Sequence, residues 1–138
     1  MSANTPNLRA VHQFFELMKA KDIDGWAKLW ANDGTILVCY PPQGFPDSIN
    51  GKEQIVAGFR QLFGHFGTYD YQIKSTYITT NADVVVVEWD VVATLPERGT
   101  IYRGNNITVF RFRNGLISHY HDYFDPRKFQ IVVDALAE

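Results

Sequence analysis

The 138-residue sequence has little of several features, and each absence narrows the possible functions. It has one cysteine, Cys39, so no disulfide can form within the chain, as is usual in a reducing compartment. No run of about 18 apolar residues occurs, so no membrane-spanning helix is expected. Residues 1–15 lack a basic stretch followed by an apolar one and predict no secretory signal. Together these absences predict a cytoplasmic protein without a membrane partner.

The chain also lacks any block of like charges. The 13 Lys and Arg residues and 15 Asp and Glu residues are interspersed, for a formal net charge of −2. A nucleic-acid-binding surface would need a basic patch, so no nucleic-acid partner is expected. Phosphate-binding glycine loops, dinucleotide fingerprints and nucleophile elbows are absent as well. We therefore expect no cofactor and no serine-triad chemistry.

Aromatic residues, in contrast, are abundant. They make up 14% of the chain within a total of 46% hydrophobic residues. The length suits one domain, residues 1–138, with a sizeable core. Large rings fill cores, and they also line pockets for apolar ligands.

The hydrophobic pattern predicts helices early in the chain and long strands later. Apolar residues recur at helical spacing in four segments, 5–22, 22–33, 52–66 and 126–138. Residues rich in Val, Ile, Thr and aromatics predict five strands, at 34–40, 69–80, 83–95, 101–113 and 116–124. This order predicts an α+β fold in which helices cover a curved, mostly antiparallel sheet and enclose one cone-shaped cavity.

The last predicted strand runs into the stretch SHYHDYFDPRKF at 118–129, which contains the densest group of polar residues in the chain. Because side chains alternate along a strand, one face carries Tyr120, Asp122 and Phe124. His119 and His121 share the other face, and a metal ion needs three or four converging ligands, so no metal site is predicted. If the aromatic face lines a cavity, burial raises the pKa of Asp122 and makes it a candidate general acid or base.

The strand VVVVEWDVV poses a similar question about its two carboxylates. Glu88 and Asp90 share one face, and the opposite face is an apolar stripe of Val85, Val87, Trp89 and Val91. The carboxylates must face either solvent or a polar pocket, and the pattern leaves both possibilities open.

Weaker candidates for the wall of a binding cavity come from several predicted elements. Two are polar residues on one strand face, one borders a proline-rich loop, and two lie on apolar helix faces: Asn106, Thr108, Tyr40, Phe14 and Phe59.

Two segments, AKDIDGWAKLWANDGTI at 20–36 and NGLISHYHDYFDP at 114–126, resemble the SnoaL-like branch of the nuclear-transport-factor-2-like superfamily. Together with the order of the elements, the resemblance covers nearly all of the chain. It implies the cone fold, a homodimer and a small ligand. The superfamily includes polyketide cyclases, ketosteroid isomerases, limonene-epoxide-hydrolase-like enzymes, phenazine-biosynthesis proteins and non-catalytic binding members.

None of the three catalytic polar residues of ketosteroid isomerase has a matching residue in this chain. The tyrosine of that family falls at Phe14, and its two aspartates fall near Val38 and Thr108. The resemblance therefore does not imply that enzyme's mechanism.

The epoxide hydrolases are matched more closely at two aspartates. HDYFDPRKF is similar to their RDYFDLREF, and WDVVATLP is similar to their VDVLRALP, which places their aspartates at Asp122 and Asp90. The arginine between the two falls at Glu88, and a carboxylate cannot replace that cation. The same alignment implies that Asp122, Asp90 and Glu88 all face the cavity.

The resulting hypothesis is a cofactor-free isomerase or cyclase acting on a small apolar carbonyl or polycyclic compound. Asp122 is the expected acid–base, and Asp90 is its expected partner. Expected to bind the substrate are Tyr120, Phe124, Asn106, Thr108, Glu88, Phe14, Tyr40 and Phe59. Two alternatives stay open, a non-catalytic ligand-binding domain and epoxide opening. The apolar stripe that begins at Val85, taken as an outer surface, supports a homodimer.

Overall fold

The computed structural model describes residues 5–137. The stretch on which the expectation of no secretory signal rests begins outside these residues. The elements follow one another as α1 (Thr5–Lys19), α2 (Ile23–Ala27), β1 (Trp30–Val38), β2 (Ser48–Asn50), α3 (Lys52–His65), β3 (Tyr69–Ile78), β4 (Val84–Leu95), the 3₁₀ helix η1 (Pro96–Arg98), β5 (Thr100–Arg113), β6 (Leu116–Tyr123) and α4 (Pro126–Leu136).

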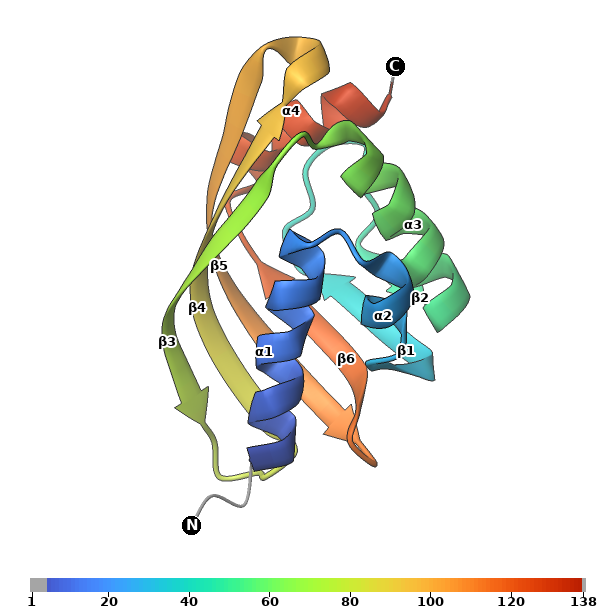
Figure 1. Ribbon diagram of the computed structural model, residues 1–138, viewed down its shortest axis with the longest axis vertical. Coiled ribbons are helices and arrows are strands. Elements are labelled where there is room, and N and C mark those ends of the chain that lie inside the picture. Colours follow the sequence, from blue (N-terminus) through green and yellow to red (C-terminus); the bar gives the residue numbers. More distant parts are fainter. Residues whose placement is uncertain (1–4, 138) are drawn as a thin grey trace.

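Within the described residues, six strands form a single curved sheet in the order β2-β1-β6-β5-β4-β3. Every neighbouring pair is antiparallel except β1 and β6, which run parallel. Helices α1, α2 and α3 lie on one side of this sheet, and α4 lies near the end where β4 passes into β5 (Figure 1). The predicted α+β fold with a mostly antiparallel sheet is therefore confirmed.

The core fills the space between the concave face of the sheet and the helices. The stripe of β4 faces this core, with exposures of 0% for Val85, 0% for Val87, 3% for Trp89 and 3% for Val91. The prediction that these residues form an outer surface was wrong. An apolar stripe buries more area against the helices than it would in solvent, so it no longer supports a dimer.

The largest differences from the predicted boundaries lie between the second helix and the third. The second helix ends at Ala27, and β1 already begins at Trp30, a residue with 1% exposure that anchors the strand in the core. A short strand, β2, also forms inside the proline-rich loop and pairs with β1.

Strand β6 contains an irregularity that simple alternation missed. Its pairing with β5 passes from Arg111↔His119 to Phe112↔Ile117, so Ser118 is an extra residue at a β-bulge. The bulge turns Ile117 into the core, where its exposure is 0%. After the bulge the alternation is regular, and it sets the orientation of Asp122.

Candidate functional site

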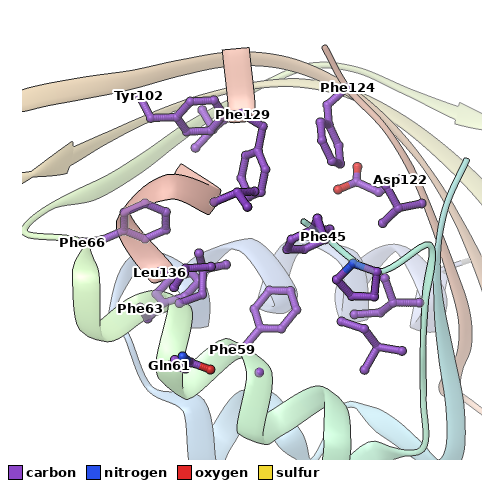
Figure 2. A pocket seen from close by; sticks show the side chains of 18 of the residues that line it. Phe45, Phe59, Gln61, Phe63, Phe66, Tyr102, Asp122, Phe124, Phe129 and Leu136 are labelled. Atoms are coloured by element: carbon purple, nitrogen blue, oxygen red, sulfur yellow. The ribbon is translucent and has the colours of Figure 1, made fainter. Parts of the chain in front are cut away.

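A cavity of about 600 Å³ lies between the concave face of the sheet and the helices. Its wall comes from all six strands, from the loop that follows β1, and from α1, α3 and α4. Figure 2 shows the aromatic and aliphatic side chains that make up most of this wall. Such a volume and such a lining are typical of sites for small, largely apolar molecules.

Asp122 supplies a carboxyl group to this wall. It lies on β6 between Val38 of β1 and Thr108 of β5, and its carboxyl points into the cavity beside Phe124 (Figure 2). The residue is half-buried, and the surface that it keeps belongs to the cavity. Burial raises the pKa of Asp122 to about 7, although hydrogen bonds from Thr108, Asn106 and the Tyr123 backbone act in the opposite direction.

Two consecutive hydrogen bonds fix the orientation of this carboxyl group. The Trp89 indole Nε1 donates to the Thr108 hydroxyl over 2.9 Å, and that hydroxyl donates to Asp122 Oδ1 over 3.0 Å. An indole N–H can only donate, so the Thr108 oxygen accepts from Trp89 and its own proton is directed at Asp122. Thr108 has 0% exposure and does not line the cavity. It therefore positions the carboxyl from behind.

Four of the predicted ligand-binding residues do line the cavity, namely Tyr120, Asn106, Phe124 and Phe59. Tyr120 lies on the same strand face as Asp122, and burial raises the pKa of its hydroxyl well above the ordinary value. The phenol thus stays a neutral hydrogen-bond donor. Asn106 is 8% exposed, and its Oδ1 has no hydrogen-bond partner among the described residues.

Phe14 lies outside the wall, which corrects its predicted role. Its ring is fully buried and stacks on Tyr120 with the ring centroids 5.2 Å apart. Phe14 therefore supports a residue of the wall and belongs to the core. Tyr40 is also displaced from the site, since it is 65% exposed.

Asp90 and Glu88 occupy the outer face of the sheet, so their predicted orientation was wrong. Their neighbours on β4, Trp89 and Val91, line the cavity, and alternation directs the carboxylates the other way. Asp90 accepts a hydrogen bond from Asn105 Nδ2 over 2.8 Å. Glu88 accepts one from the Tyr77 hydroxyl over 2.5 Å. The two aspartates that the epoxide-hydrolase resemblance pairs are thus separated by the sheet.

His119 and His121 lie on the outer face as well, with their ring centroids 6.0 Å apart. Across residues 5–137 no group of three or more His, Cys, Asp or Glu side chains is arranged to hold a metal ion. Within the same span no helix has the length and apolarity needed to cross a membrane.

Several residues of the wall were missed by the sequence reasoning. Tyr69 of β3 and Tyr102 of β5 line the cavity, as do Phe45 of the loop after β1 and Phe129 of α4. Tyr102 shares a strand face with Asn106, so the alternation of β5 contained a signal for it. The other three are brought to the site by the packing of distant elements.

Solved structures of other proteins share this fold. A Bacillus subtilis protein provisionally named an isomerase matches with a TM-score of 0.84 and 24% identity, over 97% of this chain and 96% of that one. A Mycobacterium tuberculosis protein in complex with estradiol-17beta-hemisuccinate matches with a TM-score of 0.79 and 21% identity, over 89% and 96% of the two chains. An epoxide hydrolase of M. tuberculosis matches with a TM-score of 0.73 and 20% identity, over 97% and 93%. At these identities the likeness shows the fold alone.

Comparisons of the sequence, in contrast, identify the family of the chain. An uncharacterised PhzA/B-like protein of Pseudomonas aeruginosa is 31% identical over 112 residues, which are 80% of this chain and 77% of that protein. The uncharacterised protein YesE of B. subtilis is 27% identical over 116 residues, which are 84% of this chain and 79% of that protein. The model of the SnoaL-like domain matches residues 11–120. The chain therefore belongs to the SnoaL-like family, as the resemblance implied.

Proposed function

We propose that the protein is a cofactor-free enzyme that moves a proton on a small, largely apolar carbonyl or polycyclic compound, with Asp122 as the general acid–base. One observation carries this proposal. The Asp122 carboxyl lines an apolar cavity and has its pKa raised to about 7 by burial. At neutral pH both forms of such a group are populated, so it can accept a proton and return it.

The proposed reaction uses the carboxylate twice. Ionised Asp122 removes a proton from a carbon next to the substrate carbonyl, and the electron pair of that C–H bond moves toward the carbonyl oxygen as an enolate. Neutral Asp122 then returns the proton to a second carbon or to an oxygen. No other reactant is needed. Isomerisation and ring closure of carbonyl compounds both fit this sequence.

Tyr120 and Asn106 are the proposed groups that orient the substrate. Both line the cavity, and the Tyr120 hydroxyl keeps its proton because burial raises its pKa. A neutral phenol can donate a hydrogen bond to an oxygen that gains negative charge in the reaction. The Thr108 hydroxyl holds the carboxyl plane during both proton transfers.

Epoxide opening is less well supported by the described residues. The resemblance implies two aspartates joined by a cation, yet Asp90 lies on the outer face of the sheet. The wall of the cavity, as described, contains no Lys, Arg or His side chain. The cation that would hold two aspartates in opposite protonation states is thus missing from the wall.

A binding module without catalysis is the second candidate. It is favoured by the large apolar wall and by a superfamily fold that holds estradiol-17beta-hemisuccinate in a M. tuberculosis protein. In either case the proposed partner is a small, largely apolar molecule. A homodimer and a cytoplasmic location remain predictions from the resemblance and from composition.

Two matched variants test the proposal. Exchange of α-carbon protons is measured by NMR in D₂O on a panel of bicyclic to tetracyclic ketones. Asp122→Asn should lower the enzyme-dependent exchange rate by about 10²- to 10⁴-fold, the usual contribution of a general base. Asp90→Asn, on the outer face, should exchange at the wild-type rate. Wild-type exchange in Asp122→Asn would refute the assignment. Tight binding of these ketones without exchange would favour the binding module.

A further inference from the structure

Among residues 5–137, the Asp122 carboxylate has no positively charged partner. Burial opposes its charge, and the groups that stabilise the charge are the neutral donors of Thr108, Asn106 and the Tyr123 backbone. Within the same span, the wall of the cavity contains no Lys, Arg or His side chain, and its second carboxylate, Asp134, cannot supply a cation. A carboxylate that has lost much of its water is usually paired with an opposite charge. A positive charge on a ligand would provide that partner.

Three tyrosine hydroxyls lie close enough to this carboxyl to respond to its charge. Burial, and then the charge of Asp122, raises the pKa of the hydroxyls of Tyr69, Tyr102 and Tyr120. These phenols stay neutral when Asp122 ionises, so they leave its negative charge uncompensated. Each phenol oxygen can also accept a hydrogen bond. This polar cluster is therefore suited to a cation that donates hydrogen bonds, and it repels an anion.

Aromatic rings form the part of the wall next to this cluster. Phe124 lies beside the Asp122 carboxyl (Figure 2), and Trp89 is joined to that carboxyl through the Thr108 hydroxyl. Both rings line the cavity. The face of an aromatic ring is negative and attracts an alkylammonium group within about 6 Å of the ring centroid, most strongly where water is excluded. The wall thus combines a carboxylate without a protein cation and ring faces that also favour a positive charge.

We propose that the cavity binds protonated alkylamines, with the ammonium group at the Asp122 carboxylate and the hydrocarbon part against the aromatic wall. The ligand then supplies the cation that the wall, as described, does not contain. A cavity of about 600 Å³ leaves room for a cage or bicyclic hydrocarbon of about ten carbon atoms. The inference goes beyond the proposed reaction, because it needs the position and charge of Asp122 but no proton transfer from carbon.

Three probes with the same rigid hydrocarbon cage test the role of charge. 1-Adamantylamine is a cation at neutral pH, as alkylamines are, 1-adamantanol is neutral and 1-adamantanecarboxylate is an anion. Binding is measured at pH 8 by calorimetry and by tryptophan fluorescence, because Trp89 lines the cavity. The amine should bind about 10- to 100-fold more tightly than the alcohol, the range for a hydrogen bond to a charged group. The carboxylate should bind more weakly than the alcohol, since its charge and that of Asp122 repel each other.

Three variants locate the groups that the amine recognises. Asp122→Asn keeps the shape of the side chain and removes its charge, so it should weaken binding of the amine at least about tenfold more than binding of the alcohol. Asp90→Asn removes the same charge from the outer face of the sheet and should bind all three probes like the wild type. Phe124→Leu keeps an apolar side chain but removes the ring, and should weaken the amine about 2- to 10-fold relative to the alcohol. Circular dichroism melting verifies that each variant is folded.

The pH dependence of affinity is a readout that a merely structural role of Asp122 does not change. The cation needs ionised Asp122, whose pKa is about 7. Affinity for the amine should therefore increase about tenfold from pH 6 to pH 8, whereas affinity for the alcohol should change little. The other titratable groups of the described wall are Asp134 and the hydroxyls of Tyr69, Tyr102 and Tyr120, and the raised pKa of the three phenols keeps them neutral throughout. In Asp122→Asn the increase should disappear, which separates Asp122 from Asp134.

The outcomes distinguish this ligand class from the proposed reaction. Equal affinities for the amine and the alcohol, an amine affinity that survives in Asp122→Asn, or no binding of the amine by the wild type would each overturn the inference. Proton exchange on ketones is a separate measurement on the same protein. Binding of the amine that depends on Asp122, without any proton exchange, would refute the reaction and leave the inference standing. Proton exchange without a preference for the amine would do the reverse.

Discussion

Asp122 and Asp90 are two aspartates of one sheet whose surroundings differ because they point to opposite faces. Asp122, on β6, faces an apolar cavity that raises its pKa to about 7. Asp90, on β4, faces outward and accepts a hydrogen bond from Asn105. A carboxyl group becomes useful for proton transfer when its charged form loses water, and the face of the sheet decides this. The comparison predicts large effects for changes at Asp122 and small ones for changes at Asp90.

The largest expected effect on the pH dependence of stability is that of Asp122→Asn. The folded-state pKa of Asp122, about 7, lies well above the ordinary aspartate value of 3.8. The folded protein therefore binds this proton more tightly than the unfolded chain does. Stability should fall as the pH rises from about 4 to about 7 and should then level off.

Asparagine removes the cost of burying the charge. At pH 8 the free energy of unfolding of Asp122→Asn should exceed that of the wild type by about 2 kcal/mol, and at pH 4 the two should agree. This gain in the free energy of unfolding is smaller than the full pKa shift would give, because Asp122 is only half-buried and solvent screens part of its charge. Urea unfolding at both pH values measures it. A wild-type stability that rises between pH 4 and 7 more steeply than that of the variant would contradict the raised pKa.

The next effect concerns the hydroxyl behind the carboxyl. Thr108→Val keeps the shape but removes the donor to Asp122 and the acceptor for the buried Trp89 indole. An unpaired buried N–H group costs about 1–3 kcal/mol, so the free energy of unfolding should fall by that amount. The pKa of Asp122 should also rise further, because a hydrogen bond that favours the charged form is lost.

Two measurements check this variant. The rate of proton exchange should depend on ionised Asp122 and should therefore increase with pH, with a midpoint near pH 7 in the wild type. Thr108→Val should move that midpoint to higher pH. Thr80→Val, at an exposed position, is the matched control and should change neither quantity. A loss of stability with an unmoved midpoint would mean that Thr108 supports the fold without tuning the carboxyl.

The sequence was sufficient for Asp122 but not for Asp90, and the reason is physical. On β6 the aromatic neighbours Tyr120 and Phe124 mark the inner face, and alternation is regular after the bulge at Ser118. On β4 valines lie on both faces, so the alternation yields two sets without saying which one meets the helices. The resemblance to epoxide hydrolases then selected the wrong set. Only the register of β4 within the sheet resolves the choice.

The position of Tyr69 beside Tyr102 in the sheet could not be predicted, for a related reason. The pairing of Tyr69 and Tyr102 across Ala93 depends on the register of three strands, and no pattern within one strand encodes it. The fold itself was easier to predict, because it depends on the type and order of elements, and each long element has a clear period. Site geometry depends on register and packing between elements, which local periodicity does not record.

The smallest expected effects are those of Asp90→Asn and Glu88→Gln on the outer face. Each should change the free energy of unfolding by less than about 0.5 kcal/mol, because polar contacts at the surface exchange readily with water. Asparagine and glutamine can still accept the hydrogen bonds that Asn105 and Tyr77 donate. Both variants should also keep the wild-type proton-exchange rate. A loss of more than about tenfold in either variant would show that the outer face takes part in the reaction, and the contrast between the two aspartates would fail.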